Sequence, residues 1–310
     1  MIHVAGNSVV DLLYKGVPNH LGAIDGWSAA NVCFMDRSPE AVLGGNGASV
    51  AYLLGHLGNK VVLNTQIGVD VFGNLIQGWL DEARVQLLRP PEGSTSVNTI
   101  LLDRDGTRRS IYFTGRKVDW ERSINVGDAD WFYASGYGQI DGEDLKKLVA
   151  VFENLRSLGI SIMFDPGPWF MRTVEQPDME SAWGLTDCIA GTKEELQTWG
   201  GKEAPIALAE NILGMGPSKV VIKQGAEGVT VAERGFPAVS LKTQSRHSVN
   251  TVGAGDTFNA GLIHGLMGGY RLREAAQTGL KLAMKAVVSG RGAMGVFDPN
   301  VRRVDSVSQA

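Results

Sequence analysis

The sequence predicts a three-layer α/β fold, in which helices cover both faces of a mostly parallel central sheet. Short runs rich in β-branched residues end in glycine, which is typical of strands that are buried on both faces. Between these runs lie segments whose apolar residues recur every three or four positions, as on the buried face of a helix. Glycine makes up 40 of the 310 residues and is spread over many short turns, which indicates tight connections between strands and helices.

The expected strands and helices alternate along the chain. This alternation favours a parallel sheet, because each helix carries the chain back to the edge of the sheet where the previous strand began. The expected strands are Ile2–Gly6, Lys60–Gly68, Asp130–Gly136, Ile160–Gly167, Asp187–Gly191 and Lys219–Gly225. The expected helices are Gly45–Gly58, Val71–Ala83, Glu143–Gly159, Ala204–Gly216 and Leu272–Ser289, with a further apolar helix after Asp256.

One segment departs from the alternation. Ser96–Phe113 contains two strand-like runs around Asp105 and Gly106, a dipeptide that strongly favours a hairpin turn. The two arms are too polar for the centre of a buried sheet. Together with an irregular stretch after the first strand, they predict a small β lid formed by segments of about 12–43 and 96–116 on a single domain of residues 1–310.

Composition excludes several classes of function. The net charge is −4 and no basic run occurs, so nucleic acid is not an expected partner. Cys33 and Cys188 are the only cysteines, which favours a reducing, cytoplasmic setting and makes neither a disulfide framework nor a metal cluster. The N-terminus does not read as a signal peptide, and no apolar run approaches the ~18 residues of a membrane span.

The segment NTVGAGDTFNAGLIHGL, residues 250–266, carries the strongest indication of chemistry. Gly253, Ala254 and Gly255 are small, and Asp256 follows at the start of an apolar helix. Asp256 could simply cap that helix. Alternatively, the small residues leave backbone N–H groups free to bind an anion, and the carboxylate takes a proton from an attacking hydroxyl. The P-loop and G-x-G-x-x-G cradles are absent, which counts against P-loop enzymes and dinucleotide-dependent dehydrogenases.

Three further glycine-containing segments have both structural and functional interpretations. In Leu43–Gly58, a double glycine precedes an expected helix. The glycines either give the loop flexibility and let the helix pack closely, or they make room for a ligand. In Ile67–Gly73, an aspartate precedes a helix and could be its cap. Lys223–Gly228 has the spacing of a turn between two strands.

Taken together and in this order, these segments resemble the signatures of the PfkB/ribokinase family of carbohydrate and nucleoside kinases. The N-terminal signature resembles residues 44–48 with Gly58, and a G-x-D-x-x-G motif resembles Gly68, Asp70 and Gly73. The C-terminal signature is similar to residues 250–263 at every constrained position. The resemblance covers nearly the whole chain and implies a ribokinase-like fold.

The resemblance also implies roles for individual residues. Asp256 would be the catalytic base, and the N–H groups of Gly253, Ala254, Gly255 and Asp256 would bind the transferring phosphoryl group. The implied substrate-binding residues are Asp11, Gly44, Gly45 and Asn46; the implied ATP-binding residues are Lys223, Gly225, Gly228, Gly253 and Gly255, with the loop of residues 289–295 closing over the nucleotide. The implied cofactors are ATP and Mg²⁺, with Glu194 near Mg²⁺ through water and Asn250 near a monovalent cation.

Three positions differ from the family pattern. Gly191 stands where the N-x-x-E motif has asparagine, while Thr192 and Glu195 form a capping-box pattern that would explain this turn structurally. Many members have aspartate where Asn250 stands, which puts activation by a monovalent cation in doubt. Ser49 replaces a frequent asparagine and could reshape the substrate site.

The resulting hypothesis is an ATP-dependent kinase that phosphorylates a primary alcohol of a small sugar. The alternatives are a nucleoside kinase of the same fold and a non-catalytic, sugar-binding family member. We also expect a homodimer formed through the lid, because the hairpin arms alternate apolar and polar residues and one face needs cover. Arg109 and Arg116 either face an acidic or phosphorylated substrate or lie at a solvated lid edge.

Overall fold

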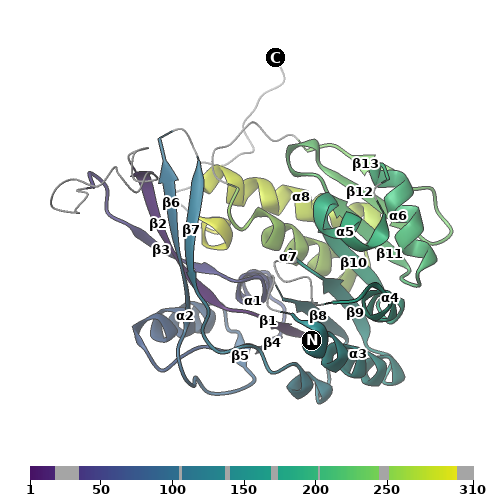
Figure 1. Cartoon of the computed structure of the whole chain (residues 1–310), viewed down its shortest axis with the longest axis horizontal. Coiled ribbons are helices and arrows are strands. Elements are labelled where there is room, and N and C mark those ends of the chain that lie inside the picture. Colours follow the sequence, from purple (N-terminus) through teal and green to yellow (C-terminus); the bar gives the residue numbers. More distant parts are fainter. Residues whose placement is uncertain are drawn as a thin grey trace.

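A nine-stranded sheet forms the centre of the computed structural model, which describes residues 1–17, 35–104, 107–136, 140–168, 174–201, 203–243 and 251–298. The strand order is β13-β12-β11-β10-β9-β8-β1-β4-β5, and all neighbouring pairs are parallel except β11–β12 and β12–β13 (Figure 1). The strands are β1 (Ile2–Gly6), β4 (Val61–Asn64), β5 (Gln86–Leu87), β8 (Trp131–Ser135), β9 (Ser161–Asp165), β10 (Cys188–Thr192), β11 (Lys219–Lys223), β12 (Val229–Glu233) and β13 (Val239–Leu241).

Helices cover both faces of this sheet, and alternate strand residues point into two separate hydrophobic cores. In β8, Phe132 and Ala134 pack into one core and Tyr133 into the other, as the two-residue period of a strand requires. The first core contains α3 (Gly142–Ser157), α4 (Gln176–Gly184), α5 (Lys193–Gly200) and α6 (Pro205–Gly214). The second contains α1 (Asn46–His56), α2 (Val71–Glu82), α7 (Ala254–Met267) and α8 (Leu272–Ser289).

The predicted three-layer α/β fold is therefore confirmed. Each expected strand and helix forms within a few residues of its expected position. The helices α4 and α5 were not among the expected helices, because their 9 and 8 residues are too few to show a clear apolar period. No helix in the described part of the chain is long and apolar enough to cross a membrane.

The predicted β lid is a second, four-stranded sheet with the order β3-β2-β6-β7. Its strands begin at Val9 rather than near residue 12, because β2 pairs in parallel with β6 from Val9 opposite Ser96 onward. The predicted hairpin turn at residues 105–106 and most of the segment 12–43 lie outside the described residues. The lid strands are β2 (Val9–Val17), β3 (Glu40–Gly44), β6 (Ser96–Asp103) and β7 (Arg108–Phe113).

The outer face of the lid carries exposed apolar side chains. Ile111 and Phe113 of β7 are 68% and 56% exposed, and Phe113 lies opposite Val97 of β6. The inner residues of β6 are buried, so the two faces of the hairpin differ as a half-buried strand requires. An exposed apolar stripe of this kind is typical of an interface between protein chains.

We predict that this outer face forms a homodimer. The variant Ile111→Asp/Phe113→Asp should sediment as a monomer at micromolar concentration, because buried charges would oppose the interface. Leu158→Asp is the matched control, since Leu158 is 62% exposed at the end of α3, away from the lid, and should not change the oligomeric state. A monomeric wild-type protein would contradict the prediction.

Candidate active site

A pocket lies between the lid and the central sheet. Its walls come from the lid, from the start of α1 and from the start of α7, three parts of the chain that are far apart in the sequence. Such a crevice beside the carboxyl ends of parallel strands is the usual ligand site of an open α/β sheet. Of the predicted site residues, the pocket brings together Asp11, Gly44, Gly45, Asn46, Gly253 and Asp256; Ser49 also lines it.

The first turn of α7 has the bare N-terminus expected from its small residues. Gly253 is the N-cap with φ of 74°, and no described side chain caps the helix. A Cβ at Gly253 would lie 3.0 Å from Cα of Gly292, so both the backbone conformation and the space favour glycine. Asp256 is not the cap but the third residue of the helix. The helix therefore presents uncapped N–H groups with a carboxylate beside them.

The carboxyl group of Asp256 lies among several other charged groups. Burial raises the pKa of Asp256 to about 7, against the opposing effect of the Lys223 ammonium group. The carboxylates of Asp165, Asp11 and Glu195 raise it further. A carboxyl group with a pKa near neutrality can both accept and release a proton at physiological pH, which is what general base catalysis needs.

Asp11 lies on the lid side of the same pocket. Its Oδ1 accepts a hydrogen bond of 2.9 Å from Nδ2 of Asn98, its neighbour across the pair β2–β6. Burial raises the pKa of Asp11 to about 6, with the Asn98 hydrogen bond and the charge of Arg108 opposing. A Cβ at Gly44 would come within 2.4 Å of Asp11 Oδ2, so a larger residue here would displace this carboxyl group.

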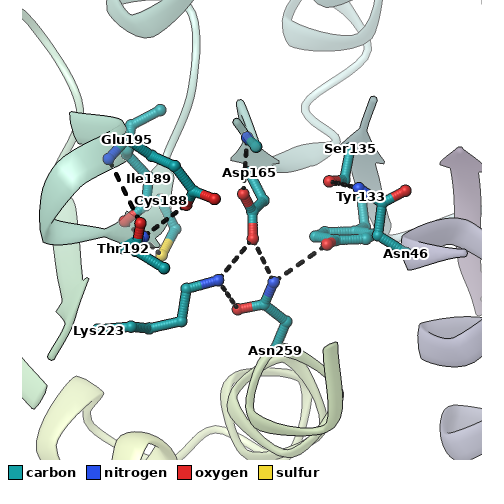
Figure 2. A network of polar contacts seen from close by, with 11 residues as sticks. Asn46, Tyr133, Ser135, Asp165, Cys188, Ile189, Thr192, Glu195, Lys223 and Asn259 are labelled. Carbon is teal, nitrogen blue, oxygen red and sulfur yellow. Dashed lines mark hydrogen bonds and ion pairs between the residues drawn. The ribbon is translucent and has the colours of Figure 1, made fainter. Parts of the chain in front are cut away.

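Two buried amide oxygens in the pocket wall have no hydrogen-bond donor among the described residues. They are Oδ1 of Asn46 and Oδ1 of Asn98. The amide nitrogen of Asn46 is already used, because Nδ2 donates to Ser135 Oγ (Figure 2). Leaving a buried acceptor unpaired costs about 1–3 kcal/mol. Both oxygens have almost no accessible surface, so a ligand hydroxyl would reach them only after a small shift of the pocket wall.

A network of buried polar side chains anchors α7 to the central sheet (Figure 2). Lys223 Nζ lies 2.7 Å from Oδ2 of Asp165, and the same oxygen accepts a hydrogen bond of 2.6 Å from Asn259 Nδ2. Asn259 Nδ2 also contacts the hydroxyl group of Tyr133 at 3.1 Å. Asn259 lies three residues after Asp256, on the same side of α7. The network therefore fixes the helix that carries Asp256.

Lys223 is part of this network rather than of the pocket wall. Burial alone would lower its pKa, but the carboxylates of Asp165 and Glu195 hold the pKa above its ordinary value. The other two residues implied for ATP, Gly225 and Gly228, lie in the turn between β11 and β12 and do not line the pocket. A Cβ at Gly228 would lie 2.0 Å from the carbonyl oxygen of Leu241, so this glycine has a structural reason.

The structure describes one of the two candidate metal positions. Glu194 is exposed, whereas its neighbour Glu195 is partly buried and accepts a hydrogen bond of 2.6 Å from Thr192 N in the predicted capping box. Burial and the nearby Asp165 raise the pKa of Glu195. Thr192 caps α5, and Glu195 completes the capping box that the sequence predicted. Asn250 lies outside the described residues.

Sequence reasoning missed three members of the site. Asp165 ends a predicted strand. Its place at the carboxyl edge of a parallel sheet could have marked it as a candidate site residue. Asn259 follows Asp256 at helical spacing, which places both on one face. Arg108 precedes the two arginines that were considered and lines the pocket, whereas Arg116 forms an exposed ion pair of 2.6 Å with Glu92.

Comparisons with known proteins agree with this geometry. Residues 29–296 match the model of the pfkB family carbohydrate kinases. The chain is 28% identical over 269 residues to the 1-phosphofructokinase of Escherichia coli K12, covering 82% of each protein. A ribokinase from Thermotoga maritima superimposes with a TM-score of 0.73 at 22% identity, covering 96% of this chain and 97% of the ribokinase. A fructokinase from Vibrio cholerae O395, solved with fructose, ADP and calcium ion, gives 0.74 at 20% identity and 94% coverage of both chains.

We predict that Lys223→Met lowers the free energy of unfolding by about 3–5 kcal/mol, because it leaves the carboxylate of Asp165 buried without its cation. Lys219→Met is the matched control on the same strand. Lys219 is partly exposed and 3.8 Å from Glu233, so its loss should cost less than about 1 kcal/mol. Urea unfolding measures both values, and equal effects would show that the Lys223 ion pair is not a special constraint.

Proposed function

Since the chain belongs to the pfkB family of carbohydrate kinases and is an ATP-dependent carbohydrate kinase, we propose that it transfers the γ-phosphoryl group of ATP to a primary alcohol of a small sugar. The family resemblance that the sequence predicted is confirmed by the match over residues 29–296. The observation that supports this reaction best is the shared pocket of Asp256 and Asp11. One carboxylate lies at a bare helix N-terminus, and the other lies beside unpaired amide oxygens.

The pocket residues divide the reaction between them. Asp11 and the amide oxygens of Asn46 and Asn98 accept hydrogen bonds from sugar hydroxyls and orient the acceptor. Asp256 takes the proton of the attacking sugar hydroxyl. At the same time, the hydroxyl oxygen bonds to the γ-phosphorus, and the bond between that phosphorus and the leaving ADP breaks. The N–H groups at the start of α7 stabilise the negative charge on the phosphoryl oxygens.

A divalent metal ion is implied by the family and fits the residues present only in part. The described residues contain no cluster of three acidic, histidine or cysteine side chains that could hold a metal ion. We propose that Glu195, rather than the exposed Glu194, helps to hold Mg²⁺ through water, and that ATP supplies direct ligands. When bound, Mg²⁺ would offset the negative charge of the phosphates. For a monovalent cation we propose weak binding, because Asn250 is neutral.

The names of related proteins and the polar groups of the pocket both bear on which sugar is the acceptor. The name 1-phosphofructokinase belongs to a relative of 28% identity, and the fructokinase of similar fold contains fructose. These names support a ketose or a related sugar as the acceptor. The unpaired oxygens of Asn46 and Asn98 support a polyhydroxylated ligand independently of the names.

We predict that Asp256→Asn and Asp11→Ala fail in different ways. Asp256→Asn keeps the N–H groups of the turn but removes the base, so kcat should fall by about 10²–10⁴ while ATP still binds. Asp11→Ala should mainly raise KM for the acceptor, because the sugar hydroxyls lose an acceptor group. Steady-state kinetics with each substrate varied, together with calorimetric ATP binding, separate the two effects. If Asp256→Asn kept more than about a tenth of the turnover, its assignment as general base would be wrong.

We also predict that the rate falls at acidic pH because Asp256 becomes protonated. Its pKa of about 7 means that the base is ionised above neutrality and lost as the pH falls through 7. In Asp11→Asn, a negative neighbour of Asp256 is absent, so the midpoint should move to lower pH. The measurement is kcat/KM for the acceptor as a function of pH. A profile that is flat between about pH 6 and 8 would contradict the role of Asp256.

A further inference from the structure

The inner face of the lid hairpin places an arginine in the pocket wall. Successive residues of β7 point to opposite faces, so Arg108, Ser110 and Tyr112 share the inner face while Ile111 lies on the outer one. Tyr112 lies opposite Asn98, which itself lies opposite Asp11, so these residues form one row across three strands. Arg108 lies four residues before Tyr112, so its Cα is about 13 Å from that of Tyr112 along β7. Its long side chain reaches the pocket that Asp11 and Asp256 line.

Arg108 differs from the other charged residues of this wall. Of the described residues that line the pocket, it is the one cation. Among the described arginines, Arg116, Arg122 and Arg291 form ion pairs with carboxylates, whereas Arg108 is exposed. Arg108 has no ion pair or hydrogen bond with a described residue, and its charge reaches Asp11 only through a longer-range attraction. Its five N–H donors are therefore available to a ligand.

The remaining polar groups of the pocket already match a sugar's hydroxyl groups. Asp11 and the amide oxygens of Asn46 and Asn98 are hydrogen-bond acceptors, and hydroxyl groups can donate to all of them. A guanidinium group offers the opposite chemistry. It donates only, carries a fixed positive charge and forms paired hydrogen bonds with a phosphate or a carboxylate. Part of the pocket is thus complementary to hydroxyls, and Arg108 is complementary to an anion.

We propose that the acceptor is a sugar that carries an anionic substituent, a phosphate or a carboxylate, and that Arg108 binds this substituent. The inference rests on the proposed kinase function and adds the chemical class of the substrate. Asp256 faces the hydroxyl to be phosphorylated, and Arg108 holds the charged group of the same sugar. A neutral sugar makes no charge-assisted hydrogen bond with this guanidinium group, so it binds less tightly.

The test compares a neutral sugar with charged relatives in a coupled assay of ADP release. The acceptors are fructose, fructose 1-phosphate and fructose 6-phosphate, with 2-keto-3-deoxygluconate as the carboxylate. The wild-type enzyme should have a kcat/KM for at least one charged acceptor that is about 10- to 100-fold above that for fructose, which is the effect of a charge-assisted hydrogen-bond pair. The phosphate and carboxylate arms decide which anion is bound.

Variants of Arg108 connect this preference to the residue. Arg108→Leu should raise KM for the charged acceptor about 10- to 100-fold and change kcat and KM for fructose little, while Arg108→Lys should restore part of the loss. Arg116→Leu removes the same charge from the segment after the hairpin, outside the pocket, and should leave every constant unchanged. Thermal melting verifies that each variant is folded.

Two results would overturn the proposal: a wild-type enzyme that uses fructose as well as every charged acceptor, or an Arg108→Leu variant that loses both kinds of acceptor equally. Calorimetric binding of fructose phosphates to wild type and Arg108→Leu gives a second measurement that needs no turnover. Binding that depends on Arg108 without phosphorylation of any acceptor would contradict the kinase reaction but support the anion site. Phosphorylation of fructose alone would support the kinase reaction but contradict the anion site.

Discussion

The ion pair between Lys223 and Asp165 is the interaction on which the arrangement of the site depends. It joins the carboxyl ends of β11 and β9, and Asn259 extends it to α7 through the same carboxylate oxygen. Because these groups are buried, the loss or displacement of any one of them would leave a charge or a hydrogen-bond donor unpaired. The network therefore holds α7, and with it Asp256 and the bare N-terminal turn, against the central sheet.

The same region shows how a single set of charges serves both stability and chemistry. Burial raises the pKa of Asp256, and the cation of Lys223 limits that rise to a value near neutrality. With a much higher pKa, the carboxyl group would hold its proton at physiological pH; with an ordinary one, it would be a weaker base. Asp11 belongs to a separate sheet and lies beside its own amide partner, so the lid and the core each contribute one carboxylate.

Local patterns in the sequence predicted the layers, the lid and the position of Asp256, whereas Asp11 was implied by the resemblance to the family. Strand and helix periods are visible within a few residues, and Gly253–Asp256 is contiguous. The interactions that join distant segments could not be predicted in this way. Asp165 and Lys223 are separated by 58 residues and become partners only when β9, β10 and β11 align. The choice between Glu194 and Glu195 depends on where α5 begins, which the cap at Thr192 decides. Arg108 was missed because only strand register distinguishes it from Arg109.

Two short connections of the lid, one to the central sheet and one to α1, lie against each other at the pocket. Residues 7–8 link β1 to β2, and Gly45 links β3 to α1; a Cβ at Gly45 would lie 2.5 Å from the carbonyl oxygen of Asn7. Both Asn7 and Gly45 line the pocket. The lid and the rest of the protein thus meet in the wall of the pocket itself. A molecule bound there would contact both connections at once, so the binding surface and the junction of the lid are one place in the structure.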